Sequence, residues 1–549
     1  MESENQRLSI GDYLITQLKE HGVSHIFGIP GDYILSFYSK LSGSSIKVIN
    51  TCDEQGAGFA ADAYARLNGL GVVCVTYDAG GLKLVNSTSQ AYAEKVPVLV
   101  IAGAPGWGER QKYPLLHHKV KEYGDQLKIF EHITVASTTI WDPEEAFSEI
   151  NRVVEHIETQ KRPGFIELPR DMVNVIPKNQ SPPVSTTTKT SAMTQEYLNS
   201  VASKATEIIN SAKQPIIIAG VEVARYGIEN SVVEFAKKAN IPMVSTFLGK
   251  SSVAESDPLY LGIYAGIVAD ESVRQYVESS DCVILIGVLL TDINLGSNTA
   301  NLVPDKMLTI NSDSCTINNQ TFLVGMELLS QITKNQLLKH DRSLAPASLI
   351  ERTPMFEAKQ QKIRAKRLFE AIGSFLDKDT ILIADIGDAV SGCLEVPTKV
   401  ARHFLSPAYY SSLGFSIPAI LGVQAKYPKL HPLVVIGDGA FQMTGIEIST
   451  AIRNHMNAIV IVLNNSGFGT ERPMIDGEFN DVASWNFHML PKVFNGGQGF
   501  LIKTERELVE AYKKAKCYNG VSILEVILDP SDISPQLQKL CTHFLTKVR

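Results

Sequence analysis

Basic residues, closely spaced cysteines and long apolar runs are all scarce in this sequence of 549 residues. Lys and Arg together number 51 against 58 Asp and Glu, which gives a net charge of -7. Such a chain lacks the basic surface on which nucleic-acid binding depends, so we expect no nucleic-acid partner. None of its cysteines stands in CxxC or zinc-ligand spacing, which indicates free thiols in a reducing compartment. The cysteines are Cys52, Cys74, Cys282, Cys315, Cys393, Cys517 and Cys541.

Neither a signal peptide nor a membrane span is visible. The first residues, MESENQRLSIGDYL, lack a basic stretch followed by an apolar one. The longest apolar runs, such as VPVLVIAGAP, have the length of a strand rather than of a bilayer. Hydrophobic residues make up 44% and charged residues 20% of the chain, enough apolar material for real cores. We therefore expect a cytoplasmic protein of about three domains with no membrane partner.

Short apolar runs alternate with amphipathic stretches along almost the whole chain. The runs are of strand length and include SHIFGIP, KVINT, GVVCVTY, VPVLVIAG, QPIIIAG, DCVILIG, ILIAD, PLVVIGDG, AIVIVLNN and SILEVIL. Helix-patterned segments such as DYLITQLKEHG, EQGAGFAADAYARL and TGIEISTAIRNH lie between several of them. Continuously apolar strands separated by helices predict parallel sheets covered on both faces, so we expect an α/β fold of doubly wound parallel sheets.

Two segments interrupt this alternation and predict the domain boundaries. Residues 179–194, NQSPPVSTTTKTSAMT, are rich in Ser, Thr and Pro, and residues 339–354, KHDRSLAPASLIERTP, show the same bias more weakly. Both patterns are typical of interdomain linkers. They divide the chain into three α/β domains, residues 1–180, 195–340 and 355–549.

The strongest local signal lies in residues 433–471, where two apolar strands each end in a polar cluster. The first strand ends at Gly437-Asp438-Gly439 and the second at Asn464-Asn465. Both clusters are expected to face one crevice, because ligands of parallel sheets bind beyond the carboxyl ends of the strands. A carboxylate, an amide oxygen and a backbone carbonyl suit Mg²⁺, which takes further ligands from phosphates. A GDG turn alone is an ordinary strand-to-helix connection, but the added Asn pair favours a phosphate and magnesium site.

The spacing of these clusters resembles the cofactor motif of the thiamine-diphosphate enzymes, and the likeness extends over the full length. IFGIPGDY, TCDEQGAGFAADAYAR, VPVLVIAGAPG and LLHHK resemble the pyruvate and indolepyruvate decarboxylase group. The middle third, with FLGKSSVAESDPLYLGIYAG, is most similar to branched-chain and aromatic 2-oxo-acid decarboxylases. The resemblance implies pyrimidine-binding, middle and diphosphate-binding domains in that order, thiamine diphosphate and Mg²⁺ as cofactors, and a 2-oxo acid, a small molecule, as substrate. It further implies an active site shared by two subunits, hence a homodimer, which we expect to pair into a homotetramer.

The resemblance also implies roles for individual residues. Asp438, Asn465 and the carbonyl of Gly467 would hold the metal ion. The other contacts to the cofactor would come from Glu54, Gly387, Asp388, Ser411, Leu413, Gly439 and Ala440. The Leu413 side chain would bend the cofactor so that its reacting groups meet. Glu54 would hydrogen-bond the pyrimidine ring and set its tautomer, although a carboxylate at a helix N-terminus is also favourable for its own sake.

Proton transfer would fall to Asp32, His117, His118 and Glu471 by the same resemblance. Each has an ordinary interpretation alone, as a turn residue or a solvated loop side chain, but together they are the relay set of these decarboxylases. Histidines and carboxylates with tuned pKa values can both protonate a decarboxylated substrate and help to expel the aldehyde. The complete set predicts an enzyme, a carboxy-lyase that decarboxylates a 2-oxo acid without oxidation.

Differences from the pyruvate-specific members predict a larger substrate. Val390 stands where those members have a bulky aromatic residue, and Thr470 replaces a larger aliphatic one. Both changes widen a pocket, and one CH₂ group in a hydrophobic pocket changes discrimination by about 1–3 kcal/mol. Leu540 and Phe544, spaced i, i+4 on a C-terminal helix pattern, either line the same pocket or simply pack the helix. We therefore expect a branched-chain or aromatic 2-oxo acid such as indolepyruvate or phenylpyruvate.

Three alternatives to this prediction remain. They are a pyruvate decarboxylase, a carboligase of the acetohydroxyacid synthase type, and a degenerate homologue that acts as a binding subunit. Carboligases of that type lack the His pair and usually bind FAD, for which no adenine-site signature is visible, and the intact residue set disfavours a degenerate homologue. The segment TYDAGGLKL, residues 76–84, also departs from the family pattern, and Asp78 within it has no interpretation from the sequence.

Overall fold

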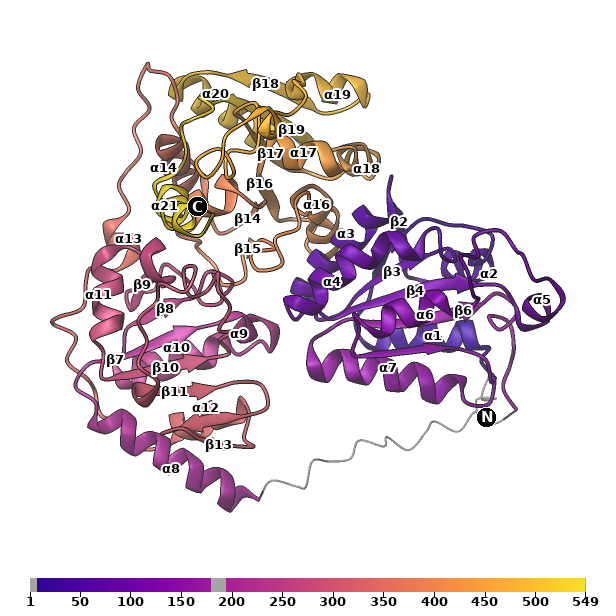
Figure 1. The fold of residues 1–549 in the computed structure, drawn as a ribbon, viewed down its shortest axis with the longest axis horizontal. Helices are drawn as coiled ribbons and strands as arrows, with labels where there is room; N and C mark the ends of the chain where they lie inside the picture. The colour runs from indigo at the N-terminus through magenta and orange to yellow at the C-terminus, as the bar shows by residue number, and fades with distance from the viewer. Residues whose placement is uncertain (1–6, 179–193, 549) are drawn as a thin grey trace. The chain divides into compact units, whose positions relative to one another are not determined.

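The computed structural model describes residues 7–178 and 194–548, which form an α/β fold built on three sheets (Figure 1). Each of the ten apolar runs forms a strand, so the predicted fold class is confirmed. The described residues group into two compact units. The first unit contains the first sheet, and the second unit contains the other two. The predicted linker at 179–194 lies, except for Thr194, outside the described residues.

The first sheet has six parallel strands in the order β2-β1-β3-β4-β6-β5. They are β1 (His25–Gly28), β2 (Lys47–Asn50), β3 (Gly71–Val75), β4 (Val98–Ala104), β5 (Ala136–Thr139) and β6 (Gly164–Pro169). The helices of this part are α1 (Ile10–Glu20), α2 (Leu35–Ser42), α3 (Glu54–Asn68), α4 (Val85–Ala93), α5 (Trp107–Lys112), α6 (Asp125–Glu131) and α7 (Ala146–Gln160). The central strands β3 and β4 are buried at every position, as expected for a sheet covered on both faces.

Two helices from the last third of the chain also belong to the first unit, α16 (Ser416–Lys426) and α18 (Glu447–Arg453). Gly422 of α16 lies so close to α3 that a Cβ atom there would meet the carbonyl oxygen of Ala60 at 2.3 Å. The Glu447 carboxylate of α18 accepts hydrogen bonds of 3.0 Å from the backbone N–H groups of Cys52 and Asp53, which lead into α3. These helices fall in the range predicted for the third domain, yet they pack against the first.

The second sheet has seven strands in the order β13-β12-β11-β10-β7-β8-β9. They are β7 (Pro215–Ala219), β8 (Met243–Ser245), β9 (Tyr260–Ile263), β10 (Cys282–Ile286), β11 (Met307–Ile310), β12 (Cys315–Ile317) and β13 (Gln320–Phe322). Its helices are α8 (Gln195–Ser211), α9 (Val221–Arg225), α10 (Glu229–Ala239), α11 (Glu271–Ser279), α12 (Glu327–Lys334) and α13 (Leu349–Arg352). Apolar clusters cover the two faces of the sheet.

This second sheet departs from the expected parallel arrangement at one edge. β12 runs antiparallel to β11, and β13 runs antiparallel to β12. Asn318 and Asn319, between β12 and β13, both have positive φ, 49° and 62°, which is the geometry of a two-residue type I′ hairpin turn. So short a connection cannot make the crossover that parallel neighbours need.

The predicted second linker, residues 339–354, is packed against the second sheet rather than free of it. His340 is 8% exposed, and Leu349 is buried in the core of this sheet. Ser348 and Glu351 form a capping box at α13, and Arg352 donates a hydrogen bond to the Leu261 carbonyl. The segment therefore forms part of the surface of the middle domain.

The third sheet has six parallel strands in the order β15-β14-β16-β17-β19-β18. They are β14 (Thr380–Ala384), β15 (Phe404–Leu405), β16 (His431–Gly437), β17 (Ala458–Asn464), β18 (Gln498–Ile502) and β19 (Val521–Ile527). The remaining helices are α14 (Ala365–Phe375), α15 (Asp388–Cys393), α17 (Asp438–Thr444), α19 (Leu490–Val493), α20 (Glu505–Cys517) and α21 (Pro535–Val548).

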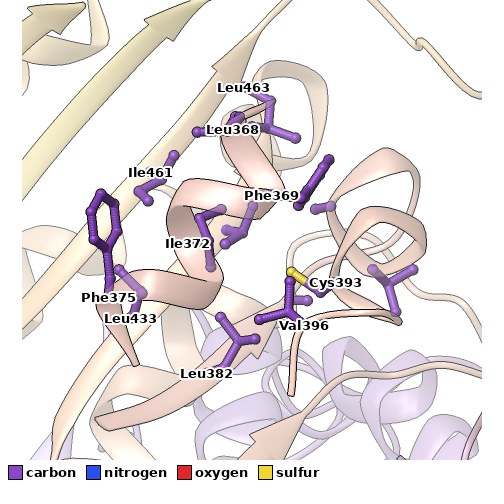
Figure 2. Close-up of a cluster of buried hydrophobic side chains, with 14 of the residues drawn as sticks. Leu368, Phe369, Ile372, Phe375, Leu382, Cys393, Val396, Leu433, Ile461 and Leu463 are labelled. Carbon is purple, nitrogen blue, oxygen red and sulfur yellow. The ribbon is translucent and has the colours of Figure 1, made fainter. Parts of the chain in front are cut away.

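The core of this sheet forms where α14 covers it (Figure 2). The helix contributes Leu368, Phe369, Ile372 and Phe375, a stripe at helical spacing, and the strands contribute Leu382, Leu433, Ile461 and Leu463. Each such side chain stabilises the fold by about 1.5–3 kcal/mol when fully buried. The cluster keeps β14, β16 and β17 together, and these are the strands whose ends carry the polar motif.

Two further expectations concern membranes and thiols. Within the described ranges, no helix has the length and apolar character that crossing a bilayer requires. All of the cysteines are free thiols, as their spacing predicted.

Replacing Gly422 with Ala should destabilise the first unit by about 1–3 kcal/mol, because the added methyl group must displace the backbone of α3. Gly373→Ala is the matched control. Gly373 is also helical, and a Cβ atom there would meet only Val396 Cγ1, at 3.9 Å, so its stability should stay constant or rise by up to about 1 kcal/mol. Urea unfolding of both variants measures the difference, and equal effects would contradict the close packing of α16 on α3.

Candidate active site

The first sheet places polar residues at the carboxyl ends of its strands. Asp32 follows β1, Glu54 follows β2, Asp78 follows β3 and Arg170 follows β6. Because these strands are parallel, their carboxyl ends share one edge of the sheet, the edge at which ligands of such folds bind.

Glu54 is the first residue of α3, and Asp53 caps that helix. The Glu54 side chain is 13% exposed, and its carboxylate forms an ion pair of 3.0 Å with the ammonium group of Lys83. Lys83 also donates a hydrogen bond to the Asp53 carboxylate. This hydrogen bond raises the pKa of Lys83, and its effect is larger than the opposite effect of burial. Lys83 was not a candidate from the sequence. The signal that points to it is the unusual segment TYDAGGLKL, in which it stands.

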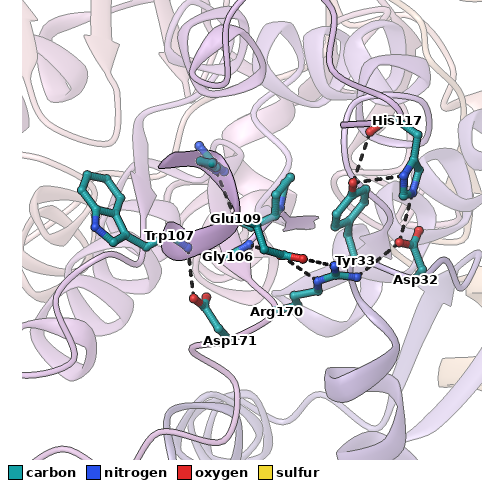
Figure 3. Close-up of polar contacts among 10 residues, drawn as sticks. Asp32, Tyr33, Gly106, Trp107, Glu109, His117, Arg170 and Asp171 are labelled. Atoms are coloured by element: carbon teal, nitrogen blue, oxygen red, sulfur yellow. Dashed lines mark hydrogen bonds and ion pairs between the residues drawn. The ribbon is translucent and has the colours of Figure 1, made fainter. Parts of the chain in front are cut away.

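His117 and Asp32 form a hydrogen-bonded pair, with His117 Nε2 3.1 Å from Asp32 Oδ2 (Figure 3). The Tyr33 ring stacks on His117 with the centroids 4.7 Å apart, and the Tyr33 hydroxyl lies 3.3 Å from Nδ1. A carboxylate can only accept a hydrogen bond, so these partners assign the proton of neutral His117 to Nε2. Nδ1 of His117 is then the nitrogen that can take up a proton.

His118 points elsewhere. Its φ is 70°, and its Nδ1 lies 3.1 Å from the carbonyl oxygen of Tyr77. Since a carbonyl also only accepts, Nδ1 carries the proton, and Nε2 is the nitrogen that can exchange one. The two rings are nearly perpendicular, at 80°, so the adjacent histidines present two separate exchangeable nitrogens.

Arg170 and Glu109 complete this polar group, and neither was a candidate from the sequence. Arg170 Nη1 lies 3.4 Å from Asp32 Oδ2, and its Nε donates to Glu109 Oε2 at 2.9 Å (Figure 3). The hydrogen bond from Arg170 holds the pKa of Glu109 below its usual range, because its effect is larger than the opposite effect of burial. Arg170 also lies over the Tyr33 ring, 5.0 Å from the centroid. The available signal was the charged pair that directly follows the apolar strand GFIELP.

The second unit contains a cavity of about 110 Å³ at the carboxyl ends of β14, β16 and β17. The cavity is lined by Ile386, Gly387, Asp388, Ala389, Leu413, Gly437, Asp438, Gly439, Ala440, Leu463, Asn465, Gly467, Phe468, Gly469, Thr470 and Glu471. The GDG and NN clusters therefore meet at one crevice, as their spacing indicated. A Cβ atom on Gly437 would meet nothing within 4 Å, so this glycine leaves space that a side chain would occupy.

Asp438 is 1% exposed, and its carboxylate accepts hydrogen bonds from the N–H groups of Gly439 at 2.8 Å and Gly467 at 3.2 Å. Burial raises the pKa of Asp438 to about 6, although backbone N–H groups oppose it. A cation would relieve this penalty, so Asp438, the Asn465 amide and the Gly467 carbonyl fit a Mg²⁺ ion that also binds phosphate oxygens. Among residues 7–178 and 194–548, no three His, Cys, Asp or Glu side chains gather as a metal site.

Asp385, at the end of β14, holds the loop that carries Leu413. Its buried carboxylate accepts hydrogen bonds from the N–H groups of Gly414 at 3.0 Å and Ser416 at 2.9 Å, and burial raises its pKa. Gly414 has a φ of 88°, which turns the chain so that Leu413 faces the cavity. Asp385 was not predicted, because a polar residue after a strand is an ordinary turn signal.

The remaining candidates divide between the cavity and its surroundings. Asp388 lines the cavity, and its carboxylate also accepts two hydrogen bonds of 3.0 Å from the N–H group of Ser534; burial raises its pKa to about 6. Val390 is 4% exposed and packs in the core around α14 instead of lining the cavity, because Gly387 to Ala389 form the cavity-facing end of α15. Ser411 and Leu540 do not line it either, and Leu540 packs at the edge of the same core. The side chain of Phe544 lies outside the described residues.

Three family models match the chain. They are the thiamine pyrophosphate enzyme N-terminal TPP binding domain over residues 8–129, the central domain over residues 202–334 and the C-terminal TPP binding domain over residues 385–526. An indole-3-pyruvate decarboxylase from Azospirillum brasilense is 32% identical, with 97% of each chain covered. A probable pyruvate decarboxylase from Schizosaccharomyces pombe is 29% identical over 97% of this chain and 95% of its own. An alpha-keto-acid decarboxylase from Mycobacterium bovis is 29% identical over 97% of this chain and 96% of its own.

Asp78 is a buried carboxyl group with little compensation. It is 1% exposed, its φ is 42°, and neither carboxyl oxygen has a well-formed hydrogen bond in the described part of the chain. The Val120 N–H group and the Tyr77 hydroxyl act on it only enough to oppose part of the effect of burial. Its backbone N–H donates to Gln126, which also donates to the buried carboxylate of Glu167. Burial first, and then the charge of Glu167, raise the pKa of Asp78 to about 6. The ionised Asp78 side chain therefore destabilises the folded state.

Asp78→Asn should stabilise the protein at alkaline pH, since Asn is never charged and also tolerates positive φ. The folded-state pKa of about 6 exceeds the ordinary value of 3.8, so the wild type loses stability as the pH rises from the lower value through the higher one. At 1.36 kcal/mol per pKa unit, the variant should gain about 3 kcal/mol above pH 7 and nothing below pH 4. Thermal unfolding of the wild type and of Asp78→Asn between pH 4 and pH 7 and above tests this expected gain in stability. A difference independent of pH would show that the charge of Asp78 is not the cause.

Proposed function

Because the chain belongs to the thiamine-diphosphate-dependent 2-oxo-acid decarboxylases, we propose that it converts a branched-chain or aromatic 2-oxo acid into the corresponding aldehyde and carbon dioxide. Decarboxylation of a 2-oxo acid, which is the reaction of a carboxy-lyase, follows from the family. The size of the substrate is our inference. The observation that carries it is the cavity at β14, β16 and β17, where Thr470 and Glu471 stand beside the GDG and NN clusters.

Thiamine diphosphate, when bound, supplies the nucleophilic carbon and the electron sink of the reaction. The residues present fit its polar end, because Asp438, Asn465 and the Gly467 carbonyl offer oxygen ligands to Mg²⁺ beside glycine-lined space. Leu413, on the loop that Asp385 anchors, would brace the bend of the cofactor. Glu54 would hydrogen-bond the pyrimidine ring from its position at the start of α3.

The histidines support decarboxylation with aldehyde release over carboligation. Nε2 of His118 and Nδ1 of His117 are separate nitrogens that can each give or take a proton. Asp32 holds the proton of His117 on Nε2 and so keeps Nδ1 available. Glu471 adds an acid at the cavity wall. A site that protonates one carbon and then deprotonates a hydroxyl group needs such a set.

Thr470 supports a substrate larger than pyruvate, because it lines the cavity where a larger aliphatic side chain would take up space. Val390 gives no such support, since it packs in the core. Pyruvate is the second candidate, because the relative from Schizosaccharomyces pombe that matches 97% of this chain is named a probable pyruvate decarboxylase. The relative from Azospirillum brasilense, named for indole-3-pyruvate, favours the larger substrate.

We also propose that the working enzyme is a homodimer, paired further into a homotetramer. Glu54 belongs to the first compact unit and Asp438 to the second. The family resemblance implies that these residues serve one active site from different subunits, so each dimer would contain two such sites.

Mixing two inactive variants tests both the residue roles and the dimer. Glu54→Gln cannot shuttle the proton and should lose about 10²–10⁴-fold in rate while it still binds the cofactor. Asp438→Ala should lose affinity for thiamine diphosphate and Mg²⁺ without unfolding. When equal amounts are dissociated and reassociated together, half of the dimers carry one intact site, so about a quarter of the wild-type activity should return.

Carbon dioxide release with the best 2-oxo acid measures the recovery. A mixture as inactive as its components, with both variants folded by circular dichroism, would contradict a site shared by subunits. Near-full activity of Glu54→Gln alone would contradict the role of Glu54.

Thr470→Leu should shift specificity towards pyruvate. The larger side chain overpacks the cavity and should cost a phenylpyruvate or branched-chain substrate about 1–3 kcal/mol, which is roughly a five- to hundredfold loss in kcat/KM. Pyruvate should lose little, because a methyl group still fits. Thr542→Leu, exposed on α21, is the control and should leave the ratio of the two kcat/KM values unchanged. An unchanged ratio in Thr470→Leu would contradict the size argument and leave the decarboxylase activity standing.

A further inference from the structure

We call the cavity that the GDG and NN clusters line the GDG cavity. A second and larger cavity lies in the same compact unit. Its volume is about 340 Å³, within the range of about 300–1,000 Å³ that is typical of small-molecule sites. Its walls come from the middle domain, from α14, from the end of α15 and the residues that follow it, and from the start of α21. The lining residues include Leu349, Lys366, Phe369, Gly373, Glu395 and Val396.

The charges around this cavity are only partly paired. Arg352 forms an ion pair of 3.1 Å with Asp270, and Glu370 forms one with Arg367 outside the cavity. Glu395 is half-buried and Lys366 is exposed, and within the described residues neither side chain has a hydrogen bond or an ion pair. Burial raises the pKa of Glu395, although Arg352 opposes it. Glu395 and Lys366 are therefore available to contact a ligand, although the positive charges of Arg352, Lys250 and Lys539 also act on Glu395.

One face of α14 forms a wall of the cavity. Lys366, Phe369, Glu370 and Gly373 stand at i, i+3, i+4 and i+7, which is one side of a helix. Gly373 is unexpected there, because glycine weakens a helix interior. No close packing requires it, since a Cβ atom would meet only Val396 Cγ1 at 3.9 Å. What the glycine does is leave the cavity open.

The rest of the wall is apolar and firmly held. Leu349, Phe369 and Val396 are buried side chains of the core and also line the cavity (Figure 2 labels Phe369 and Val396). A Cβ atom on Gly392 of α15 would lie 2.0 Å from the Phe369 ring, so α15 fixes that ring in place. An apolar group can bind here against a preformed surface.

We propose that this cavity binds an α-amino acid with an apolar side chain. The Glu395 carboxylate, which makes no hydrogen bond in the described residues, accepts hydrogen bonds from the ligand's ammonium group, and Lys366 pairs with the ligand's carboxylate. Phe369, Leu349 and Val396 cover the side chain. A zwitterion can contact both groups at once, whereas an amine or a carboxylic acid alone can contact only one of them.

The second cavity borders the same helix, α15, as the GDG cavity. Gly387, Asp388 and Ala389 begin α15 and line the GDG cavity, whereas Gly392 and the residues that follow it line the second cavity. Ser534, directly before α21, donates to Asp388, and the next two residues, Pro535 and Gln536, line the second cavity. The two cavities therefore share α15 as a wall, and a hydrogen bond joins α15 to the segment that begins α21.

Calorimetric titration of the full chain with thiamine diphosphate and Mg²⁺ present tests the proposal, with L-leucine and L-phenylalanine as probes. At least one should bind with one site per chain. For L-leucine, the matched fragments 3-methylbutylamine and 4-methylpentanoate should bind roughly tenfold more weakly or worse, since each lacks one charged contact. The result would not depend on which 2-oxo acid the enzyme decarboxylates.

Two variants locate the site. Glu395→Gln should weaken the amino acid roughly tenfold or more, whereas Glu207→Gln, exposed on α8, should bind like the wild type. Gly373→Leu should fill the cavity and abolish binding with an equal or higher Tm, which separates loss of the site from loss of the fold. Absence of binding of both amino acids at millimolar concentration, or unchanged affinity in both Glu395→Gln and Gly373→Leu, would overturn the proposal.

Discussion

Burial of both faces of a parallel sheet confines chemistry to the edge where its strands end. A polar side chain in the middle of β3, β4 or β16 would lose its hydration without gaining a partner, at a cost of several kcal/mol. The interiors of these strands are accordingly apolar throughout. Asp438, Asn465 and Asp385 each follow directly where the apolar part of a strand ends. The candidate site is thus a consequence of how the sheets are covered.

Three buried aspartates that follow strands of these sheets have carboxylates in different surroundings. Asp385 is surrounded by backbone N–H donors and serves as an anchor for a loop. Asp438 also accepts hydrogen bonds from backbone N–H groups and, like Asp385, has a pKa that burial raises. Asp438 differs from Asp385 because it lines the cavity beside Asn465 and Gly467, which suits a group that awaits a cation. Neither carboxyl oxygen of the equally buried Asp78 has a well-formed hydrogen bond in the described residues. These carboxylates therefore differ in what surrounds them rather than in how deeply they are buried.

Strands and motifs were predictable from the sequence because they depend on neighbouring residues. Ten apolar runs became strands, and the GDG and NN clusters met as their spacing indicated. What could not be predicted depends on contacts across the fold. Lys83 reaches Glu54, Arg170 reaches Asp32, and Val390 turns into the core although its neighbour Ala389 faces the cavity. The antiparallel β12–β13 hairpin could have been predicted from the sequence, since Asn318-Asn319 is a recognisable turn pair.

The packing of α16 and α18 on α3 has a consequence for recombination between homologues. A chimera that exchanges only residues 1–180 would bring a foreign α3 against Gly422 and Glu447, two positions fitted to the Ala60 carbonyl and to the N–H groups of Cys52 and Asp53. Residues 417–430 and 444–457 must be exchanged together with the N-terminal segment if these contacts are to be kept. In this chain the unit of inheritance is therefore discontinuous, and a crossover point chosen at the end of the first sheet would divide one interface between two parents.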